Sequence, residues 1–168
     1  MKRALIGSGG FAREIMAHMG VKLPCFVDDD FVVDDDIPLS KFDPNEYEVL
    51  IAIGDPNIRY NLFKKLPKNT KFFTFIHQSA QILDSNINIG EGSVICANCI
   101  LTTNIKIGSH SHLNLLTTIG HDTVIGDFLT TAPGAKISGN CEIGNRVYIG
   151  TNASIKQKLK ICDNAVIS

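Results

Sequence analysis

The stretch that decides the fold is residues 101–137, LTTNIKIGSHSHLNLLTTIGHDTVIGDFLTTAPGAKI. Every sixth residue from Leu101 onward is Leu or Ile, and Thr131 is the one exception. The same step of six extends this column back to Leu83 and forward to Ile167, and we expect no inserted residue along it. Fourteen of its fifteen positions are Ile or Leu. A regular spacing of this length indicates an internal structural repeat.

A second column of small or β-branched residues follows four positions after the first, as at Ser93, Cys99 and Ala135. A period of six matches neither an α-helix nor an alternating strand. It fits one side of a triangular coil, in which a short strand leads to a corner. Glycines often follow the first column, where we expect the corner to need their conformational freedom: Gly90, Gly108, Gly120, Gly126, Gly144 and Gly150. Three sides of six residues make a coil of eighteen, and nearly five coils must stack over residues 83–168 to bury their apolar columns.

Short apolar runs alternate with helical stretches before the repeat. We expect strands at residues 2–6, 25–27, 49–53 and 72–76, with helices over 11–19 and from about 56 to 66. This alternation predicts a parallel sheet that binds its ligand at the carboxyl ends of the strands. The chain is therefore expected to contain two domains, a small Rossmann-like α/β domain of residues 1–76 and a β-helical domain of residues 77–168.

A glycine loop, Gly7-Ser8-Gly9-Gly10-Phe11-Ala12, follows the first strand and fits the weak dinucleotide motif G-x-G-x-x-A. A full dinucleotide fold has two halves and about 150 residues, but only 76 residues precede the repeat, so a mononucleotide or nucleotide-sugar fits better. Its pyrophosphate would lie on the amides of residues 9–11 at the helix N-terminus. Asp28 or Asp29, after the second strand, would accept hydrogen bonds from ribose hydroxyls or a uracil ring. The alternative is that the loop is only a tight strand-to-helix turn.

Bulk composition excludes several classes of partner. Sixteen Lys and Arg against seventeen Asp and Glu give a net charge of −1, so charge does not attract the chain to nucleic acid or to an anionic membrane. No run of eighteen apolar residues is available for a transmembrane helix. The first apolar run meets Gly7 too early for a signal peptide. Five cysteines without a secretory context favour reduced thiols and a cytoplasmic location.

Four stretches together resemble one family. They are GSGGFARE at 7–14, IAIGDPNIR at 51–59, FIHQSA at 75–80 and IGHDTVIGD at 119–127. In combination they are similar to bacterial sugar acetyltransferases of the UDP-4-amino-sugar N-acetyltransferase and sialic acid O-acetyltransferase family, within the hexapeptide-repeat acyltransferases. The resemblance covers all 168 residues. It implies a left-handed parallel β-helix, acetyl-coenzyme A as the donor, and a homotrimer with active sites between neighbouring β-helices.

The resemblance also implies a catalytic group. The family's base is a histidine followed by an acidic residue, and His121 and Asp122 match this pair. An amine or hydroxyl that attacks a thioester must lose a proton, and imidazole titrates near neutral pH. A neighbouring carboxylate orients the ring and raises its basicity. Asn114 matches a family asparagine near the acetyl group and the acceptor.

Ligand-binding positions follow from the same resemblance. For coenzyme A they are Thr130, where a relative carries a histidine, Gly139, whose missing side chain would leave room for pantetheine, and Thr151. For the nucleotide-sugar they are Gly9, Gly10, Phe11, Asp28, Asp29, Gly54 and Arg59. Phe11 replaces a histidine often found in the UDP-sugar enzymes, so the contact of that imidazole is absent. Family members usually continue with another coil or so and a closing strand, which implies a longer β-helix than residues 77–168 provide.

Two other chemistries are weighed against this one. His77, His110 and His112 suggest zinc, as in the γ-class carbonic anhydrases. The spacings of two (His110 to His112) and nine (His112 to His121) do not match the pair of histidines five apart that those enzymes need. We therefore expect no metal. Cys96 and Cys99 form a C-x-x-C, yet Cys99 falls in the inward column, as does Cys141, so core packing is the better interpretation.

The sequence therefore predicts acetyl transfer from acetyl-coenzyme A to the 4-amino group of a nucleotide-linked amino-deoxysugar, for the synthesis of surface polysaccharide or protein-linked glycans. Two alternatives stay open. One is O-acetylation of a sialic acid or a related sugar, and the other is a non-catalytic solenoid that only binds. The identity of the nucleotide and of the sugar also stays open.

Overall fold

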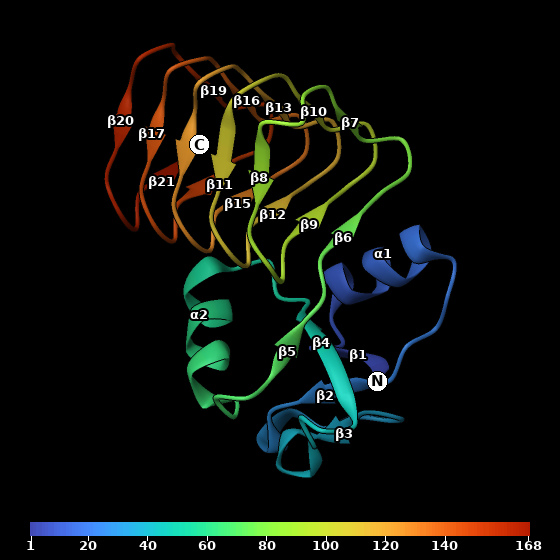
Figure 1. The fold of residues 1–168 in the computed structure, drawn as a ribbon. Coiled ribbons are helices and arrows are strands. Elements are labelled where there is room, and N and C mark those ends of the chain that lie inside the picture. Colours follow the sequence, from blue (N-terminus) through green and yellow to red (C-terminus); the bar gives the residue numbers. More distant parts are fainter.

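The computed structural model describes residues 1–168 and shows two domains joined by one crossing of the chain (Figure 1). An α/β domain lies below a β-helix in this view, and the chain passes between them from β5 (Lys71–Phe72) to β6 (Phe75–Ile76). The fourth strand expected over residues 72–76 is therefore divided. β5 pairs with the α/β sheet and β6 pairs with the β-helix, so the domains meet at residues 73–74 rather than after residue 76.

The α/β domain is a parallel sheet of order β3-β2-β1-β4-β5, as the alternation of strands and helices predicted. Its other strands are β1 (Lys2–Ile6), β2 (Cys25–Val27), β3 (Ile37–Pro38) and β4 (Tyr47–Ile51). Two helices, α1 (Gly10–Met19) and α2 (Pro56–Lys65), lie on opposite sides of it in Figure 1, and 3₁₀ turns cover Asp29–Phe31 and Leu39–Lys41. The two-residue β3 is too short to be found from sequence.

The two helices begin differently, which matters for the site. Asp55 caps α2, because its carboxylate accepts hydrogen bonds from the amides of Asn57 and Ile58, both at 2.9 Å. The first residue of α1 follows Gly9, which provides no side-chain cap. The amides of the first turn of α1 therefore stay available to an external acceptor.

The β-helix consists of three parallel sheets, which we call its first, second and third faces in chain order. The first face contains β6, β9 (Val94–Ile95), β12 (His112–Leu113), β15 (Thr130–Thr131), β18 (Tyr148–Ile149) and β21 (Val166–Ile167). The second contains β7 (Gln81–Ile82), β10 (Ile100–Leu101), β13 (Thr118–Ile119), β16 (Lys136–Ile137) and β19 (Ser154–Ile155). The third contains β8 (Ile87–Ile89), β11 (Ile105–Ile107), β14 (Val124–Ile125), β17 (Glu142–Ile143) and β20 (Lys160–Ile161).

The register confirms a coil of eighteen residues, since Leu113 pairs with Thr131 and Ile119 with Ile137. The expected start of the column is wrong by one residue. Leu101 pairs with Ile82, not Leu83, whose side chain is 61% exposed. The first coil therefore has one extra residue between β7 and β8.

The repeated glycines do not serve the corners as expected. Most corners are made by non-glycine residues in the left-handed region, such as Asn104, Asp122 and Asn140 with φ of 50°, 58° and 55°, a conformation that Asn and Asp tolerate better than most residues. Two other corners are glycines outside the repeated set, Gly92 and Gly134, with φ of 69° and 75°. Gly120 is instead needed for close packing of coils, because a Cβ there would lie 2.5 Å from the amide nitrogen of Gly139.

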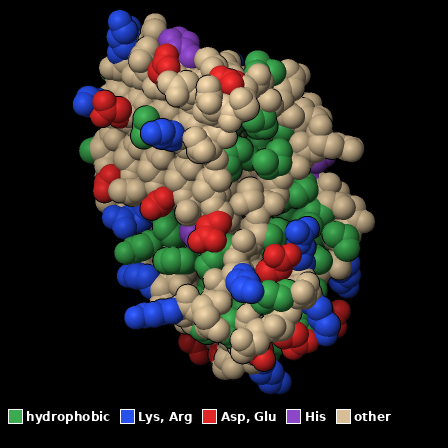
Figure 2. All heavy atoms as spheres, in the orientation of Figure 1, with side chains coloured by type: hydrophobic (Ala, Val, Ile, Leu, Met, Phe, Trp, Pro, Cys, Tyr) green, Lys and Arg blue, Asp and Glu red, His purple; other side chains and the backbone are tan.

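The interior of the β-helix is apolar, and Cys96, Cys99 and Cys141 are buried in it as predicted. Lys, Arg, Asp and Glu side chains lie on the outer surface of both domains (Figure 2). One continuous hydrophobic cluster extends from Leu5 and Leu50 of the α/β domain into these coils. The domains therefore share a core, which fixes their relative position. No helix in the chain combines the length and apolarity needed to cross a membrane.

Candidate functional site

His121 and Asp122 form a hydrogen-bonded pair at the corner between the second and third faces. Their ring and carboxylate are joined Nδ1 to Oδ2 at 2.7 Å, and both side chains are about half exposed, 48% and 44%. Asn104, one coil earlier, donates its Nδ2 to Asp122 Oδ1 at 2.6 Å. The hydrogen bond from Asn104, followed by that from His121, lowers the pKa of Asp122. An ionised Asp122 that accepts from Nδ1 leaves Nε2 as the basic nitrogen of a neutral ring.

Gly139 lies directly against the His121 ring. A Cβ at this position would come within 2.6 Å of Nε2 and 2.8 Å of both ring carbons beside it. The family resemblance predicted that the missing side chain of Gly139 leaves room for pantetheine. The structure shows that the His121 imidazole already occupies this space.

A cavity of about 320 Å³, which we call the junction pocket, lies between α1 and the first face of the β-helix. It unites residues that the sequence assigned to different ligands: Gly10, Phe11 and Gly54 from the α/β domain, with Asn114, Thr130 and Thr151 from the coils. The carboxamide oxygen of Asn114 accepts from the amide of Leu115 at 2.7 Å, which directs its NH₂ group to other partners. The remaining lining residues are Glu14, His112, Thr131, Ala132, Pro133 and Tyr148.

His112 in this pocket was not predicted as a ligand-binding residue. Its ring is 1% exposed, packs 4.9 Å from the ring of Phe11, and has no hydrogen-bond partner at either nitrogen. Burial, and then the charge of Arg59, hold the pKa of His112 well below its usual range, so the ring is neutral. The sequence considered this residue only as a metal ligand.

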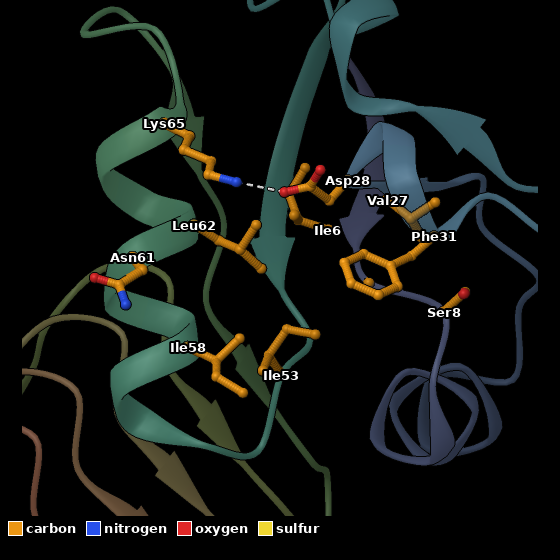
Figure 3. A pocket seen from close by; sticks show the side chains of 11 residues that line it. Ile6, Ser8, Val27, Asp28, Phe31, Ile53, Ile58, Asn61, Leu62 and Lys65 are labelled. Carbon is orange, nitrogen blue, oxygen red and sulfur yellow. Dashed lines mark hydrogen bonds and ion pairs between the residues drawn. The ribbon is translucent and has the colours of Figure 1, made fainter.

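A second cavity of about 330 Å³ opens at the carboxyl ends of β1, β2 and β4 (Figure 3), and we call it the nucleotide pocket because the sequence predicts nucleotide binding at this edge of the sheet. Asp28 lines it and forms an ion pair with Lys65 from the last turn of α2, and Phe31 faces the same space. The other lining residues are Ile6, Gly7, Ser8, Val27, Ile53, Ile58, Asn61 and Leu62. Asp29 does not line the pocket, because its carboxylate accepts from the amide of Ser40 at 3.0 Å. Phe31, three residues after Asp28, and Lys65, which reaches Asp28 only in the folded domain, were not predicted from the sequence.

Two predicted binding residues, Arg59 and Thr130, hydrogen bond to each other and to the backbone. Arg59 is fully buried, and all its hydrogen bonds go to backbone oxygens and to the Thr130 hydroxyl. The Thr130 hydroxyl in turn donates to Gly54 O at 2.7 Å. Arg59 therefore has no N–H donor left for a ligand, and the one donor of Thr130 is already used, although its hydroxyl borders the junction pocket.

The three histidines weighed as metal ligands lie in different surroundings. His110 is stacked on Phe128, with ring centroids 5.0 Å apart, and is enclosed by Phe63 and Phe72. His112 lines the junction pocket, and His77 hydrogen bonds to Ser79 at 2.8 Å.

A single chain does not bring His121 into the junction pocket. Its corner separates the second face from the third, so in a three-sided coil it lies opposite the first face, against which α1 packs. Asn114, by contrast, follows β12 on the first face and lines the pocket. The candidate base and the candidate acceptor pocket are thus on different sides of one β-helix.

Comparison with known proteins agrees with both domains. Residues 2–66 match the PglD N-terminal domain, and residues 116–157 match the bacterial transferase hexapeptide, six repeats. The GDP-perosamine N-acetyltransferase of Escherichia coli O157:H7 is 31% identical over 172 residues, which cover 91% of this chain and 77% of that protein. WeeI from Acinetobacter baumannii AYE superposes with a TM-score of 0.85 and 32% identity, over 99% of this chain and 88% of its own. The acetyltransferase domain of PglB from Neisseria gonorrhoeae FA1090, solved with acetyl coenzyme A, gives 0.82 and 25%, over 98% and 86%.

Proposed function

Because the chain belongs to the hexapeptide-repeat bacterial sugar acetyltransferases and is an acetyl-coenzyme A-dependent sugar N-acetyltransferase, we propose that it acetylates the 4-amino group of a nucleotide-linked amino-deoxysugar. The observation that carries this proposal is the His121–Asp122 pair, whose free ring nitrogen lies at an exposed corner of a left-handed parallel β-helix. A relative that covers most of the chain acts, by its name, on an amino sugar carried by a nucleoside diphosphate.

The chemistry needs no covalent enzyme intermediate. The amine nitrogen attacks the thioester carbonyl, the new C–N bond forms, and the C–S bond breaks to release coenzyme A. His121 Nε2 accepts the proton that the amine loses and returns it to the departing thiolate. Asp122, held ionised by Asn104, orients the ring and stabilises it while it carries the proton.

We propose that the two cavities bind different parts of the acceptor. The apolar nucleotide pocket, with the Asp28–Lys65 pair at its edge, suits a nucleoside (Figure 3). The uncapped first turn of α1, at Gly9, Gly10 and Phe11, suits the diphosphate. The junction pocket then receives the sugar beside Asn114. Gly139 and Thr151 remain the candidates for the acetyl-coenzyme A side.

The separation of His121 from the junction pocket favours an assembly. A cyclic trimer would place the His121 corner of one subunit against the first face of the next and would create three equivalent sites. We therefore infer a homotrimer in which each site combines two subunits. Five free thiols are consistent with a cytoplasmic enzyme that supplies acetylated sugars for glycan synthesis.

The test is a substrate panel of UDP-, GDP-, dTDP- and CMP-linked 4-amino sugars, with thiol release from acetyl-coenzyme A as the readout. We expect one nucleotide class to be acetylated on nitrogen. In a thermal-shift assay, a ligand at a hundred times its Kd stabilises by roughly 2.7 kcal/mol. Acetylation of a free sialic acid hydroxyl with no turnover of any nucleotide-sugar would contradict the proposal.

A further inference from the structure

Arg59 is the only fully buried residue among the Lys, Arg, Asp and Glu side chains, and it lies at the seam between the domains. From α2 its Nη1 donates to Ile53 O at 2.5 Å and to Gly54 O at 3.2 Å, in the loop that follows β4. Its Nε donates to His110 O at 2.9 Å. Its Nη2 reaches Phe128 O and Leu129 O at 3.0 Å and Thr130 Oγ1 at 2.9 Å.

These partners belong to the two halves of the acceptor site. Ile53 lines the nucleotide pocket and Gly54 lines the junction pocket, so the loop at residues 53–54 borders both cavities. Thr130 lines the junction pocket from the opposite side and donates its own hydroxyl to Gly54 O at 2.7 Å. One guanidinium and one hydroxyl thus connect the α/β wall of the junction pocket to its β-helical wall.

The bonding pattern indicates a geometric role in addition to stabilisation. None of the partners is a carboxylate, and burial lowers the pKa of Arg59 to about 9, so the group stays charged at neutral pH without a counter-ion in contact. An apolar seam would join two domains without the penalty of burying a charge. A planar fork with five N–H donors instead fixes the distance and the angle between the walls that it joins.

We propose that Arg59 is a positioning residue for the acceptor. It holds the 53–54 loop against β15, so that a sugar whose nucleotide is bound by the α/β domain reaches Asn114 in the junction pocket. This inference rests on the proposed function, because it assumes that the acceptor spans the two cavities. Arg59 does not touch the substrate.

The test compares Arg59→Lys with a matched control, Arg146→Lys. Lysine keeps the charge and most of the length of Arg59 but loses the fork. Arg146 also crosses the seam, with its guanidinium carbon 4.7 Å from the ring centroid of Tyr60 in α2, yet it does not contact the 53–54 loop. Steady-state kinetics would vary the nucleotide-sugar that the substrate panel identifies and then acetyl-coenzyme A, and circular dichroism and thermal melting would check folding.

For Arg59→Lys we expect the acceptor KM to rise about tenfold or more, with the KM for acetyl-coenzyme A within about twofold of wild type. Arg146→Lys should leave both values unchanged. If Arg59 were only structural, Arg59→Lys would lower the melting temperature and kcat but leave both KM values unchanged. This result would overturn the inference.

Thr130→Val provides a second route if Arg59→Lys does not fold. The substitution keeps the shape of the side chain but removes the link to Gly54, so the acceptor KM should rise by a smaller factor. A rise confined to the KM for acetyl-coenzyme A would overturn the inference and return Thr130 to the coenzyme site. If the wild-type protein acetylates no nucleotide-sugar at all, the proposed function fails instead, and the two failures are distinguishable.

Discussion

The imidazole of His121 rests on the backbone of Gly139, eighteen residues later and one coil further along the β-helix. A Cβ at Gly139 would lie 2.6 Å from Nε2, the nitrogen that the hydrogen bond to Asp122 leaves free to act as a base. The conformation of the ring therefore depends on a glycine that takes no part in the chemistry.

Substitution of Gly139 by Ala should displace the ring without disrupting the coil. A misplacement of about 1 Å at a reacting group can cost on the order of 100-fold in rate. We expect kcat/KM to fall between tenfold and 100-fold by this estimate, with little change in melting temperature. Ser138→Ala, at the exposed preceding position, is the control. Unaltered kinetics in Gly139→Ala would mean that the His121 ring has another productive position.

Removal of the proposed base, His121, should have a larger effect. His121→Ala should keep the fold, because the side chain is half exposed and pairs only with Asp122. Acetyl transfer should fall by roughly 10²–10⁴-fold, the usual range for loss of a general base. Thiol release under saturating acetyl-coenzyme A measures the effect. A stable variant that retains more than about a tenth of the wild-type kcat/KM would remove His121 from the mechanism.

The assembly can be tested by complementation. If each site combines His121 of one subunit with the junction pocket of the next, co-expression of His121→Ala with Asn114→Ala chains creates some interfaces where both residues are wild type. Random mixing predicts that about a quarter of the sites are intact. We expect activity well above that of either variant alone. Sedimentation that shows an active monomer, or mixed oligomers that recover nothing, would contradict a shared site.

The buried His110 predicts a loss of stability in acid. Burial, and secondarily the charge of Arg59, lower its pKa to about 4, so the folded state holds it neutral while the unfolded chain binds a proton near the usual value of about 6.5. The contribution of neutral His110 to the free energy of unfolding is complete above pH 6.5 and is lost as the pH falls towards 4.

His110→Phe should reduce this acid sensitivity. Phe128 already occupies the equivalent corner one coil later with φ of 61°, so an aromatic hydrocarbon ring is acceptable there. Urea unfolding at pH 7 and 4.5 should show that the variant loses about 2 kcal/mol less than wild type. Some dependence of stability on pH should remain in the variant, because burial also lowers the pKa of His112. An unchanged difference would show that His110 does not titrate on unfolding.

The sequence predicts the coils well because their signal is local and repeated, whereas the assignment of His121 as the base comes from the family resemblance and stays a prediction. The apolar column that includes Leu113 and Ile119 is found by counting every sixth residue, and the corner at His121 lies between two positions of this column. The start at Leu83 was wrong because Ile82 beside it is equally apolar, so composition does not show which side chain points inward.

The burial of Arg59 cannot be predicted from the sequence for a different reason. An arginine early in a helix, beside a glycine loop, is normally exposed. Its burial depends on carbonyl oxygens of residues 51 to 70 positions away, at His110, Phe128 and Leu129. Nothing in the residues around Arg59 indicates that these oxygens converge on it. The same holds for the Asp28–Lys65 pair, whose members come from different elements.

The last prediction separates the two ligands by domain. Gly10 begins α1 and lines the junction pocket, and a Cβ added there would meet only the end of the Arg13 side chain, at 3.8 Å. Gly10→Val should therefore fold normally but place a branched side chain where a phosphate must approach the backbone amides. We expect the acceptor KM to rise tenfold or more, about 1.4 kcal/mol, with the KM for acetyl-coenzyme A changed little. Both constants follow from kinetics in which each substrate is varied in turn. An effect mainly on acetyl-coenzyme A would mean that the α/β domain binds the donor, and the assignment of the two cavities would have to be reversed.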